Sequence, residues 1–248
     1  NSLGQIAGQK ETTWSSAESE NNMSEEISGI IYNSNNQRVS FVRKEQKMTS
    51  PERYTIIGAG HGGKAMAAHL ALMGAKVTLY NRTFDHISII KKRGGIELEN
   101  AEGVRGFGKL KNVTADMGDA LKKAQMIMVV VPSSAHGDVA RAAAPHLKNG
   151  QIIVLHPGRT GGVLEFAKVL RDEGCRADVT LAEAETFIYA SRTDGPAEAR
   201  IFRIKEAVPL AALPAVRTER VLDAINDAYP QFIDGINVLN TGLNNMGA

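Results

Sequence analysis

Apolar runs alternate with helical patterns from Tyr54 onward. Continuous β-rich runs predict strands at residues 54–57, 76–80, 126–131 and 151–155. Between the first two runs, Met66, Leu70 and Met73 fall on one face of a helix, and Gly74 can end that helix. Continuous apolar runs are typical of strands buried on both faces, as in a parallel sheet. The pattern therefore predicts an α/β fold with a doubly wound, mostly parallel sheet that helices cover on both sides.

Weaker patterns fill the rest of this span. Further strands are predicted near residues 96–98, 179–182, 187–190 and 201–204, and residues 103–113 are predicted to supply a turn and a strand that returns beside 96–98. Helices are predicted near residues 116–124, 135–147, 163–171 and 217–228. No internal repeat and no Pro- or Ser-rich linker interrupts the pattern, so residues 48–235 are predicted to form one domain.

Residues 1–47 differ in composition from everything that follows. They are rich in Ser, Asn, Gln and Glu, and no periodicity is sustained, which predicts a disordered extension. The segment also lacks the basic and apolar regions of a secretory signal. The chain begins with Asn1, whereas Met48 lies just before the first predicted strand. We hypothesise that Met48 is the natural start, and an intact mass of the protein made from its native gene would test this.

The composition narrows the classes of function. Lys and Arg number 29 against 27 Asp and Glu, without a basic stripe, so nucleic acid is not an expected partner. The longest apolar stretches fall far short of the roughly 20 residues that span a bilayer, so no membrane partner is expected. Cys175 is the only cysteine, which favours a reducing, cytoplasmic setting without a disulfide. The 6 histidines show no ligand-like spacing, so no metal site is expected.

Gly58, Gly60 and Gly63 form a G-x-G-x-x-G motif directly after the first predicted strand. Gly58 permits a tight turn, Gly60 removes a side chain that would block phosphates, and Gly63 lets the following helix approach the strand. Unpaired N–H groups and the positive helix end then lie beside a pyrophosphate. The motif, with His61 inside it, is therefore predicted to bind a dinucleotide cofactor.

Asn81 and Arg82 follow the second predicted strand, where such folds contact the adenosine ribose. A carboxylate at this place bonds the ribose 2′-hydroxyl of NAD, but here the residue is a neutral amide. The Arg82 guanidinium can stack on adenine or bond a 2′-phosphate. NADP is therefore favoured, and NAD is possible. In the alternative reading, Arg82 is a solvated loop charge and Asp85 reaches the ribose.

Loops after the later strands supply further candidates, since ligands of open parallel sheets lie outside the carboxyl ends of the strands. Pro132 and Ser133 could let the nicotinamide end of the cofactor lie against the backbone, while Ser133 and its neighbour could also cap the next helix. His156 is a candidate general base or a structural histidine, and Arg159 could hold a substrate carboxylate. Glu185 either lines the cleft or caps a neighbouring loop.

Six segments in a set order resemble a known family. They lie at residues 58–65, 129–132, 156–162 (HPGRTGG), 185–192 (ETFIYASR), 205–214 (KEAVPLAALP) and 237–245 (NVLNTGLNN). In these segments the chain is similar to the NAD(P)-binding domain of the opine dehydrogenases, the octopine and nopaline dehydrogenase group. The resemblance spans about residues 54–248, and the later segments are much more specific than the glycine motif.

The resemblance implies an activity and a second domain. Opine dehydrogenases condense an amino acid with an α-keto acid and deliver hydride from NAD(P)H to the imine carbon, at a site between the nucleotide domain and an all-helical domain. Residues 236–248 would then start the helical domain, with Asn245 on the substrate side. The family's catalytic His would follow Ala248, so no catalytic residue is expected within the chain, and this part alone is expected to be inactive.

Two other functions are compatible with the same sequence features. One is a related two-domain NAD(P)-dependent dehydrogenase that acts on a hydroxy acid, glycerol phosphate or ketopantoate. The other is a non-catalytic nucleotide-sensing module that uses the same fold to regulate a partner. The polar loop at residues 156–162 and the segment at 237–245 favour the enzyme, because a sensor has no use for a polar substrate wall.

Overall fold

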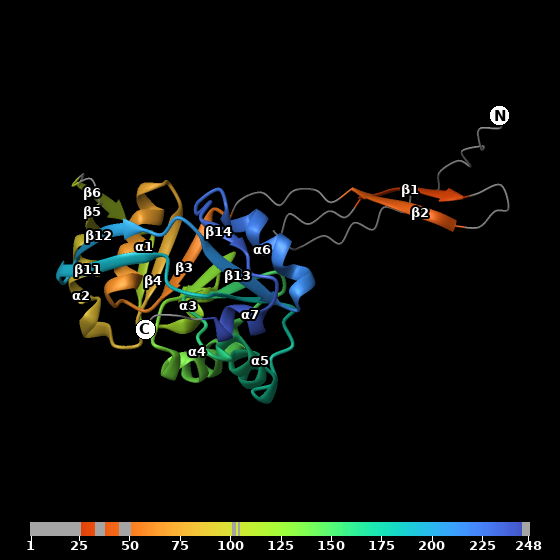
Figure 1. Ribbon diagram of the computed structural model, residues 1–248. Coiled ribbons are helices and arrows are strands. Elements are labelled where there is room, and N and C mark those ends of the chain that lie inside the picture. The colour runs from red at the N-terminus through yellow and green to blue at the C-terminus, as the bar shows by residue number, and fades with distance from the viewer. Residues whose placement is uncertain (1–25, 33–37, 45–50, 101–102, 104, 245–248) are drawn as a thin grey trace. The chain divides into compact units, whose positions relative to one another are not determined.

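Two compact units make up the chain, one within residues 1–49 and one within residues 50–248. The computed structural model describes residues 26–32, 38–44, 51–100, 103 and 105–244 (Figure 1). In the first unit, β1 (Glu26–Tyr32) pairs antiparallel with β2 (Arg38–Lys44). This hairpin differs from the disorder predicted for residues 1–47, and the reason is a local density of Ile, Val, Phe and Tyr, which favour extended pairing. The rest of that segment, and Met48, lie outside the described residues.

A mostly parallel sheet forms the centre of the second unit. Its strands, in spatial order, are β14 (Phe232–Asp234), β13 (Val208–Leu213), β10 (Thr180–Ala184), β9 (Ile152–Leu155), β8 (Met126–Val129), β3 (Arg53–Ile57), β4 (Lys76–Tyr80) and β7 (Asn112–Thr114). Neighbouring strands run parallel except β10 and β13. The strand order reverses between β3 and β8, which is the topological switch point of a doubly wound Rossmann sheet. The predicted fold class is confirmed.

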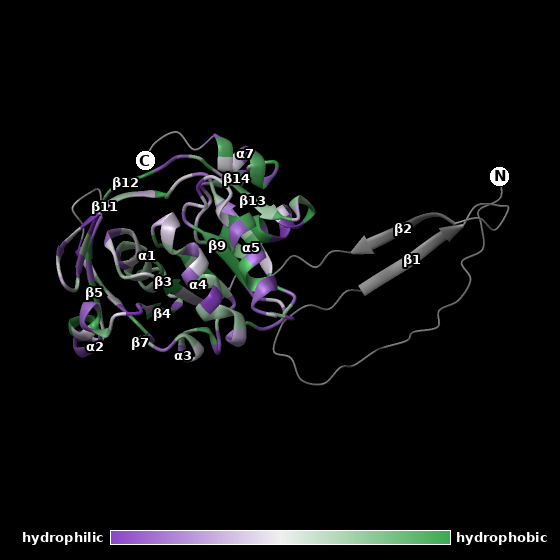
Figure 2. Cartoon of the chain, turned by 90° about the horizontal axis from the view of Figure 1, so that it is seen from below, coloured by the Kyte–Doolittle hydropathy of each residue, from purple (hydrophilic) through white to green (hydrophobic). Residues whose placement is uncertain are grey.

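Helices cover both faces of this sheet. On one face, α3 (Met117–Leu121), α4 (His136–Ala143) and α5 (Gly162–Asp172) bury residues such as Leu121, Val139 and Phe166 against β8 and β9. In Figure 2 the central strand β9 is hydrophobic, while hydrophilic residues mark the outward sides of α4 and α5. The helix predicted at 135–147 is shorter than expected, because 3₁₀ turns at Ser133–Ala135 and Ala144–His146 flank α4.

Helix α1 (His61–Leu72) lies between two sheets. Besides β3 and β4, it contacts every strand of a second sheet made of β11 (Tyr189–Gly195), β12 (Glu198–Ile204), β5 (Gly95–Glu99) and β6 (Arg105–Lys109). Its residues Ala65 to Ala68 are therefore buried all round. The sequence predicted a single apolar face that included Met73, but Met73 is 45% exposed. The return strand predicted after residues 96–98 is present as β6, which pairs antiparallel with β5, whereas only the tertiary structure pairs β5 with β12.

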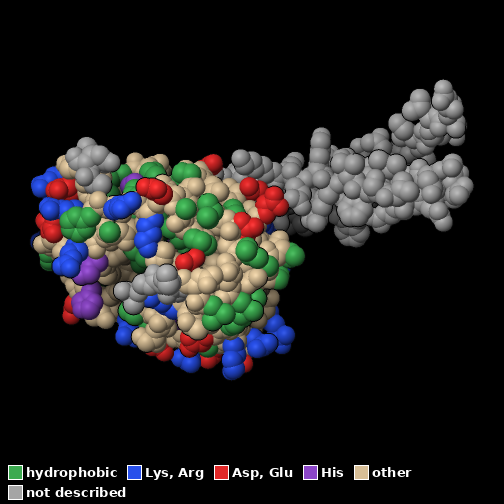
Figure 3. Space-filling view, in the orientation of Figure 1, with side chains coloured by type: hydrophobic (Ala, Val, Ile, Leu, Met, Phe, Trp, Pro, Cys, Tyr) green, Lys and Arg blue, Asp and Glu red, His purple; other side chains and the backbone are tan. Residues whose placement is uncertain are grey.

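The remaining helices are α2 (Ser88–Arg93), α6 (Thr218–Ile225) and α7 (Val238–Leu243). Helix α7, where the sequence places the start of a second domain, packs against β10 and β13 of this same unit. Over the described residues, no helix has the length and apolar character needed to cross a bilayer. Acidic and basic side chains occur at several separate places on the face shown in Figure 3.

Candidate functional site

The glycine turn after β3 has the backbone geometry that its sequence predicts. Gly58 adopts φ +109°, and a Cβ at that position would lie 2.3 Å from the Val130 carbonyl oxygen. A Cβ on Gly63 would lie 1.8 Å from the Gly58 carbonyl oxygen, whereas a Cβ on Gly60 would meet nothing within 4 Å. Gly58 and Gly63 are thus required by the fold itself. Gly60 is free of any such packing constraint and faces open space.

The start of α1 fits a phosphate group. Gly60 is its N-cap, no side chain caps the helix, and its first turn holds no acidic residue. The first N–H groups of a helix need external partners, and the helix dipole favours an anion beside them. A dinucleotide pyrophosphate would supply both, with Gly60 leaving room for its oxygens. The arrangement therefore fits the group that the motif predicts.

Thr193 of β11 and Phe187, which lies two residues before that strand, contact the glycine turn from the side. His61 Nδ1 accepts a hydrogen bond from the Thr193 N–H at 3.0 Å and lies 2.7 Å from the Thr193 hydroxyl. Phe187 lies over Gly62, where a Cβ would come within 2.7 Å of its ring. The exposed His61 ring thus links the turn to β11, in addition to any contact with a cofactor.

Asn81 and Arg82 have different roles at the end of β4. The Asn81 Oδ1 accepts a hydrogen bond from the Ala59 N–H at 3.3 Å, and its Nδ2 donates to the Thr83 carbonyl at 2.9 Å. Asn81 therefore braces the glycine turn with both ends of its amide. The Arg82 side chain is 76% exposed and pairs with Asp138 at 3.6 Å. An exposed pair of this kind is worth about 0–1 kcal/mol, so a ligand phosphate can compete for the guanidinium.

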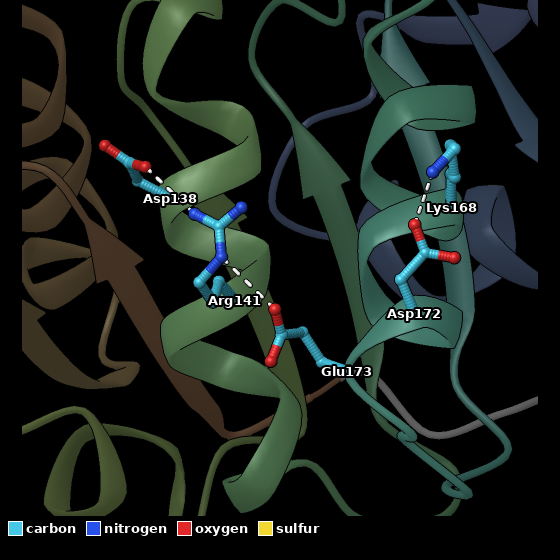
Figure 4. Close-up of polar contacts among 5 residues, drawn as sticks. All are labelled: Asp138, Arg141, Lys168, Asp172 and Glu173. Atoms are coloured by element: carbon cyan, nitrogen blue, oxygen red, sulfur yellow. Dashed lines mark hydrogen bonds and ion pairs between the residues drawn. The ribbon is translucent and has the colours of Figure 1, made fainter.

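Asp138 is shared with a second ion-pair chain that joins α4 to the end of α5 (Figure 4). Arg141 Nη1 bonds Asp138 Oδ1 at 3.2 Å, and Arg141 Nε bonds Glu173 Oε1 at 3.2 Å. Lys168 and Asp172 form a separate pair along α5. Because Arg141 already engages Asp138, Arg82 is not its sole counterion.

A pocket of about 680 Å³ opens beyond the carboxyl ends of β8 and β9, where the sequence predicts the nicotinamide and substrate groups. Its lining residues are Val131, Pro132, Ser133, Ser134, Pro157, Gly158, Arg159, Thr160, Gly162 and Glu165. The structure thus brings together Pro132, Ser133 and Arg159. Neither Ser133 nor Ser134 makes a side-chain cap bond to the helical turns that follow, so the alternative capping role is not seen.

His156 does not line this pocket. Its side chain is 1% exposed, its Nε2 lies 3.1 Å from the Met128 sulfur, and its ring lies 5.6 Å from that of Phe232. Burial lowers the pKa of His156 to about 3, so the ring is neutral. His156 is therefore a structural residue in this fold. It cannot act as a general base, because its buried ring has no access to a substrate in the pocket. The sequence placed His156 in a loop at the strand end. The end of β9 is buried, however, so the strand carries His156 into the core.

Glu185 lies just after β10, half-buried, outside the lining of the pocket. Its backbone N–H donates to the Pro209 carbonyl at 2.8 Å, and the nearby Lys205 Nζ donates to the Thr186 hydroxyl at 2.6 Å. Burial lowers the pKa of Lys205, against the opposing effect of Glu185. Lys205 is a further polar group at this edge, and its place in the sequence does not reveal it. Asn245 lies outside the described residues.

Glu183, two residues before Glu185 and within β10, joins three segments. Its carboxylate accepts hydrogen bonds from the Val163 N–H at 3.0 Å and from the Thr241 hydroxyl at 2.9 Å. The side chain is 1% exposed, and a Cβ on Gly158 would lie 2.1 Å from Glu183 Oε2. Burial raises the pKa of Glu183 despite both bonds. It thus ties the pocket loop and α5 to α7, a role that its spacing to Glu185 could not reveal.

Replacing Glu183 with Gln is expected to stabilise the protein increasingly as the pH rises above 4.5. A carboxyl whose pKa is raised by folding contributes most stability below its unfolded pKa and loses that contribution as the pH rises through its folded pKa. Gln resembles the protonated acid at every pH, so it keeps the contribution. Denaturant unfolding of both proteins from pH 4.5 to 8 measures the difference. Glu185→Gln is the matched control. An equal pH trend in both variants would show that the effect does not come from the raised pKa of Glu183.

His136 is a second buried group that sequence reasoning missed. It is 0% exposed at the start of α4, and a Cβ on Gly162 would lie 2.9 Å from its Nδ1. Neither ring nitrogen has a hydrogen-bond partner among the described residues. Burial lowers the pKa of His136 to about 4, so the ring is neutral beneath the floor of the pocket. In the described residues, no group of three His, Cys, Asp or Glu side chains is arranged to hold a metal ion.

The doubly wound sheet and the glycine turn define a Rossmann domain of the dinucleotide-binding type. Residues 53–172 match the family described as the N-terminus of NAD-dependent glycerol-3-phosphate dehydrogenase. The match covers β3 to α5 and so includes the turn and both walls of the pocket.

The chain is a homologue of opine dehydrogenase. It is 37% identical over 201 residues to the opine dehydrogenase of Arthrobacter sp. (strain 1C), covering 81% of this chain and 55% of that protein. The resemblance predicted from the six segments is confirmed. This chain therefore spans little more than half the length of that relative.

Solved structures of octopine and yersinopine dehydrogenases share the fold. The structure of octopine dehydrogenase with NADH and L-arginine matches with a TM-score of 0.66 at 20% identity, covering 76% of this chain and 50% of that one. Yersinopine dehydrogenase with bound NADP⁺ matches with a TM-score of 0.61 at 19% identity, covering 77% and 49%.

Proposed function

We propose that this chain is the coenzyme-binding part of an NADP-preferring opine dehydrogenase. The observation that carries the proposal is the open start of α1 at Gly60, next to the pocket beyond β8 and β9. The homology to opine dehydrogenase runs over 201 residues, well beyond the 53–172 match to the glycerol phosphate enzymes. It supports the opine reading over that alternative and over a non-catalytic sensor.

The residues of the chain would divide the work along the carboxyl edge of the sheet. The N–H groups after Gly60 hold the pyrophosphate, Arg82 meets the 2′-phosphate, and Pro132 and Ser133 border the nicotinamide. Arg159 lines the same pocket and can hold a carboxylate of the keto acid or amino acid. The bound coenzyme supplies hydride to the carbon of the imine that the two substrates form with loss of water.

We do not propose any described histidine near the pocket as the proton donor of this reaction. His136 and His156 are buried and neutral, so they can neither reach the imine nor carry a proton to it. We retain the expectation that the catalytic His and the contact by Asn245 belong to the segment beyond α7. A reducing, cytoplasmic setting is part of the proposal and is supported by the single cysteine.

The assay that tests the activity uses the protein from its complete gene. NADPH oxidation is expected to require both an amino acid and an α-keto acid, and a secondary amine dicarboxylate is expected as product by mass spectrometry. Oxidation supported by dihydroxyacetone phosphate alone, without an amino acid, would favour the glycerol phosphate alternative. Coenzyme binding without turnover on any of these substrates would favour the sensor.

Arg82→Ala is expected to raise the Kd for NADPH about tenfold and to change the Kd for NADH less than about twofold. The reason is that only NADPH carries the 2′-phosphate that the guanidinium would bond. Isothermal titration of the chain with each coenzyme measures both constants. Arg141→Ala removes a cation that shares Asp138 but belongs to α4, and it serves as the control. A parent protein that prefers NADH would overturn the assignment of Arg82.

A further inference from the structure

A second pocket lies at the opposite edge of the main sheet. It has a volume of about 640 Å³ and opens at the amino ends of β3, β4 and β7, beside α3. The glycine turn follows the carboxyl end of β3, which is five residues long. At about 3.3 Å per residue, the strand separates the two sites by roughly 15 Å. The second pocket is therefore distinct from the coenzyme site.

Cations dominate the lining of this pocket. Arg53, Lys76, Lys111, Lys122 and Lys123 line it, and Asp119 is the acidic residue among its lining residues. The Asp119 carboxylate already accepts a hydrogen bond from the Asn112 amide at 2.8 Å. The whole chain carries nearly equal numbers of acids and bases, 27 and 29, so this concentration of positive charge is local. Positive charges gathered around one pocket repel one another and attract anions into the pocket.

Little within the described residues neutralises these cations. Lys76 pairs with Glu52 at 2.9 Å, and both side chains are more than half exposed. Glu52 is not part of the lining, and among the described residues the side chains of Lys111, Lys122 and Lys123 form no ion pair. An exposed pair such as Lys76 with Glu52 contributes only about 0–1 kcal/mol, so a multivalent anion can displace it.

Hydrogen bonds tie together the main-chain segments beside the pocket. The Thr55 hydroxyl donates to the Ala120 carbonyl at 2.8 Å and joins β3 to α3. The Gln125 Oε1 accepts hydrogen bonds from the N–H groups of Glu52 at 3.0 Å and Arg53 at 3.1 Å. Main-chain segments that carry the cations are thus held in place before any ligand binds, which lowers the entropy lost on binding.

We propose that this pocket binds an oligophosphate group, from inorganic polyphosphate or from a nucleotide. Its volume is within the range of about 300–1,000 Å³ usual for small-ligand sites. The five lysine and arginine side chains of the lining match the several charged oxygens of a di- or triphosphate. The pocket is a candidate effector site on the far edge of the sheet from the coenzyme.

The test is a titration of the chain with inorganic tripolyphosphate at low ionic strength, with NADPH present at saturation. One site is expected, and Lys122→Gln/Lys123→Gln is expected to weaken it about tenfold or more. The control is Lys91→Gln/Lys92→Gln, a matched pair of adjacent exposed lysines at the end of α2. It carries the same change of charge and is expected to change the affinity less than about twofold.

Further arms identify the source of the phosphate and guard against misfolding. ATP binding more tightly than tripolyphosphate points to a nucleotide, equal affinities point to the phosphate chain alone, and adenosine is expected not to bind. In the parent protein, tripolyphosphate is expected to slow amide hydrogen exchange in residues 111–124 and not in residues 88–93. The proposal is overturned if tripolyphosphate does not bind, if saturating NADPH abolishes its binding, if adenosine binds equally, or if both lysine pairs weaken binding to the same extent.

Discussion

Gly63→Ala is expected to lower the free energy of unfolding by about 3 kcal/mol or more and to abolish measurable binding of NADPH. The added methyl would lie 1.8 Å from the Gly58 carbonyl oxygen, a main-chain atom with no flexible end that could move aside. Either α1 shifts away from β3 or the turn opens, and both changes displace the N–H groups that a pyrophosphate would meet. Denaturant unfolding and isothermal titration measure the two losses.

Gly60→Ala separates the two effects. A Cβ at Gly60 meets nothing within 4 Å, and Gly60 has φ −75°, which any L-residue adopts. The unfolding free energy of the Gly60→Ala variant is expected to stay within about 0.5 kcal/mol of the parent value, while its Kd for NADPH rises roughly tenfold or more. If Gly60→Ala binds the coenzyme as tightly as the parent, the pyrophosphate does not lie over this turn. If Gly63→Ala folds and binds normally, the close approach of α1 to β3 is not what the glycine provides.

The protein is expected to lose about 2 kcal/mol of stability for each of His136 and His156 between pH 7 and pH 5. Burial lowers their pKa values to about 4 and about 3, below the ordinary value of 6.5. The fold therefore favours the neutral rings. Their contribution is complete above pH 6.5 and is lost as the pH falls toward the folded pKa values, because the unfolded chain takes up protons there and the folded chain does not.

Unfolding free energies of the parent and of His136→Leu/His156→Leu, measured between pH 7 and pH 5, test this linkage. Neither ring nitrogen of His136 has a partner among the described residues, and leucine suits a buried site, so the variant is expected to fold. Its stability is expected to depend less on pH than that of the parent. The exposed His86, replaced by Leu, is the control. An acid loss as steep in the double variant as in the parent would rule out these two histidines as its origin.

Several site features followed from the sequence because they rest on local backbone chemistry. The spacing of Gly58, Gly60 and Gly63 after a strand predicts a turn, and the structure shows a positive φ, open space and a close approach at these three positions in turn. Pro132, Ser133 and Arg159 were predicted at strand ends and line one pocket. These predictions needed only the rule that ligands meet the carboxyl edge of a parallel sheet.

Other features depended on contacts between distant segments. The sequence left His156 open as a general base or a structural histidine, and only the fold shows it buried against Phe232 and Met128. Asn81 was predicted to lie beside the ribose, and only the fold shows that its amide also bonds Ala59 and Thr83. Glu183 gained its partners from Val163 and Thr241, which are 20 and 58 residues away in the chain. Periodicity along one segment cannot show which side chains another segment will bury.

The sequence by itself determined the doubly wound sheet, the glycine turn at its first crossover and the resemblance to opine dehydrogenase. These depend on local periodicity, on the conformational freedom of glycine and on the order of short segments, all of which can be read from neighbouring residues. Only the tertiary structure decided that α1 lies between two sheets, that His136 and His156 are buried, and that five cations meet at the amino edge, from β3, from β4, from just before β7 and from just after α3. The physical reason is that burial and electrostatic fields are sums over segments that folding brings together, and no single stretch of the chain contains that sum.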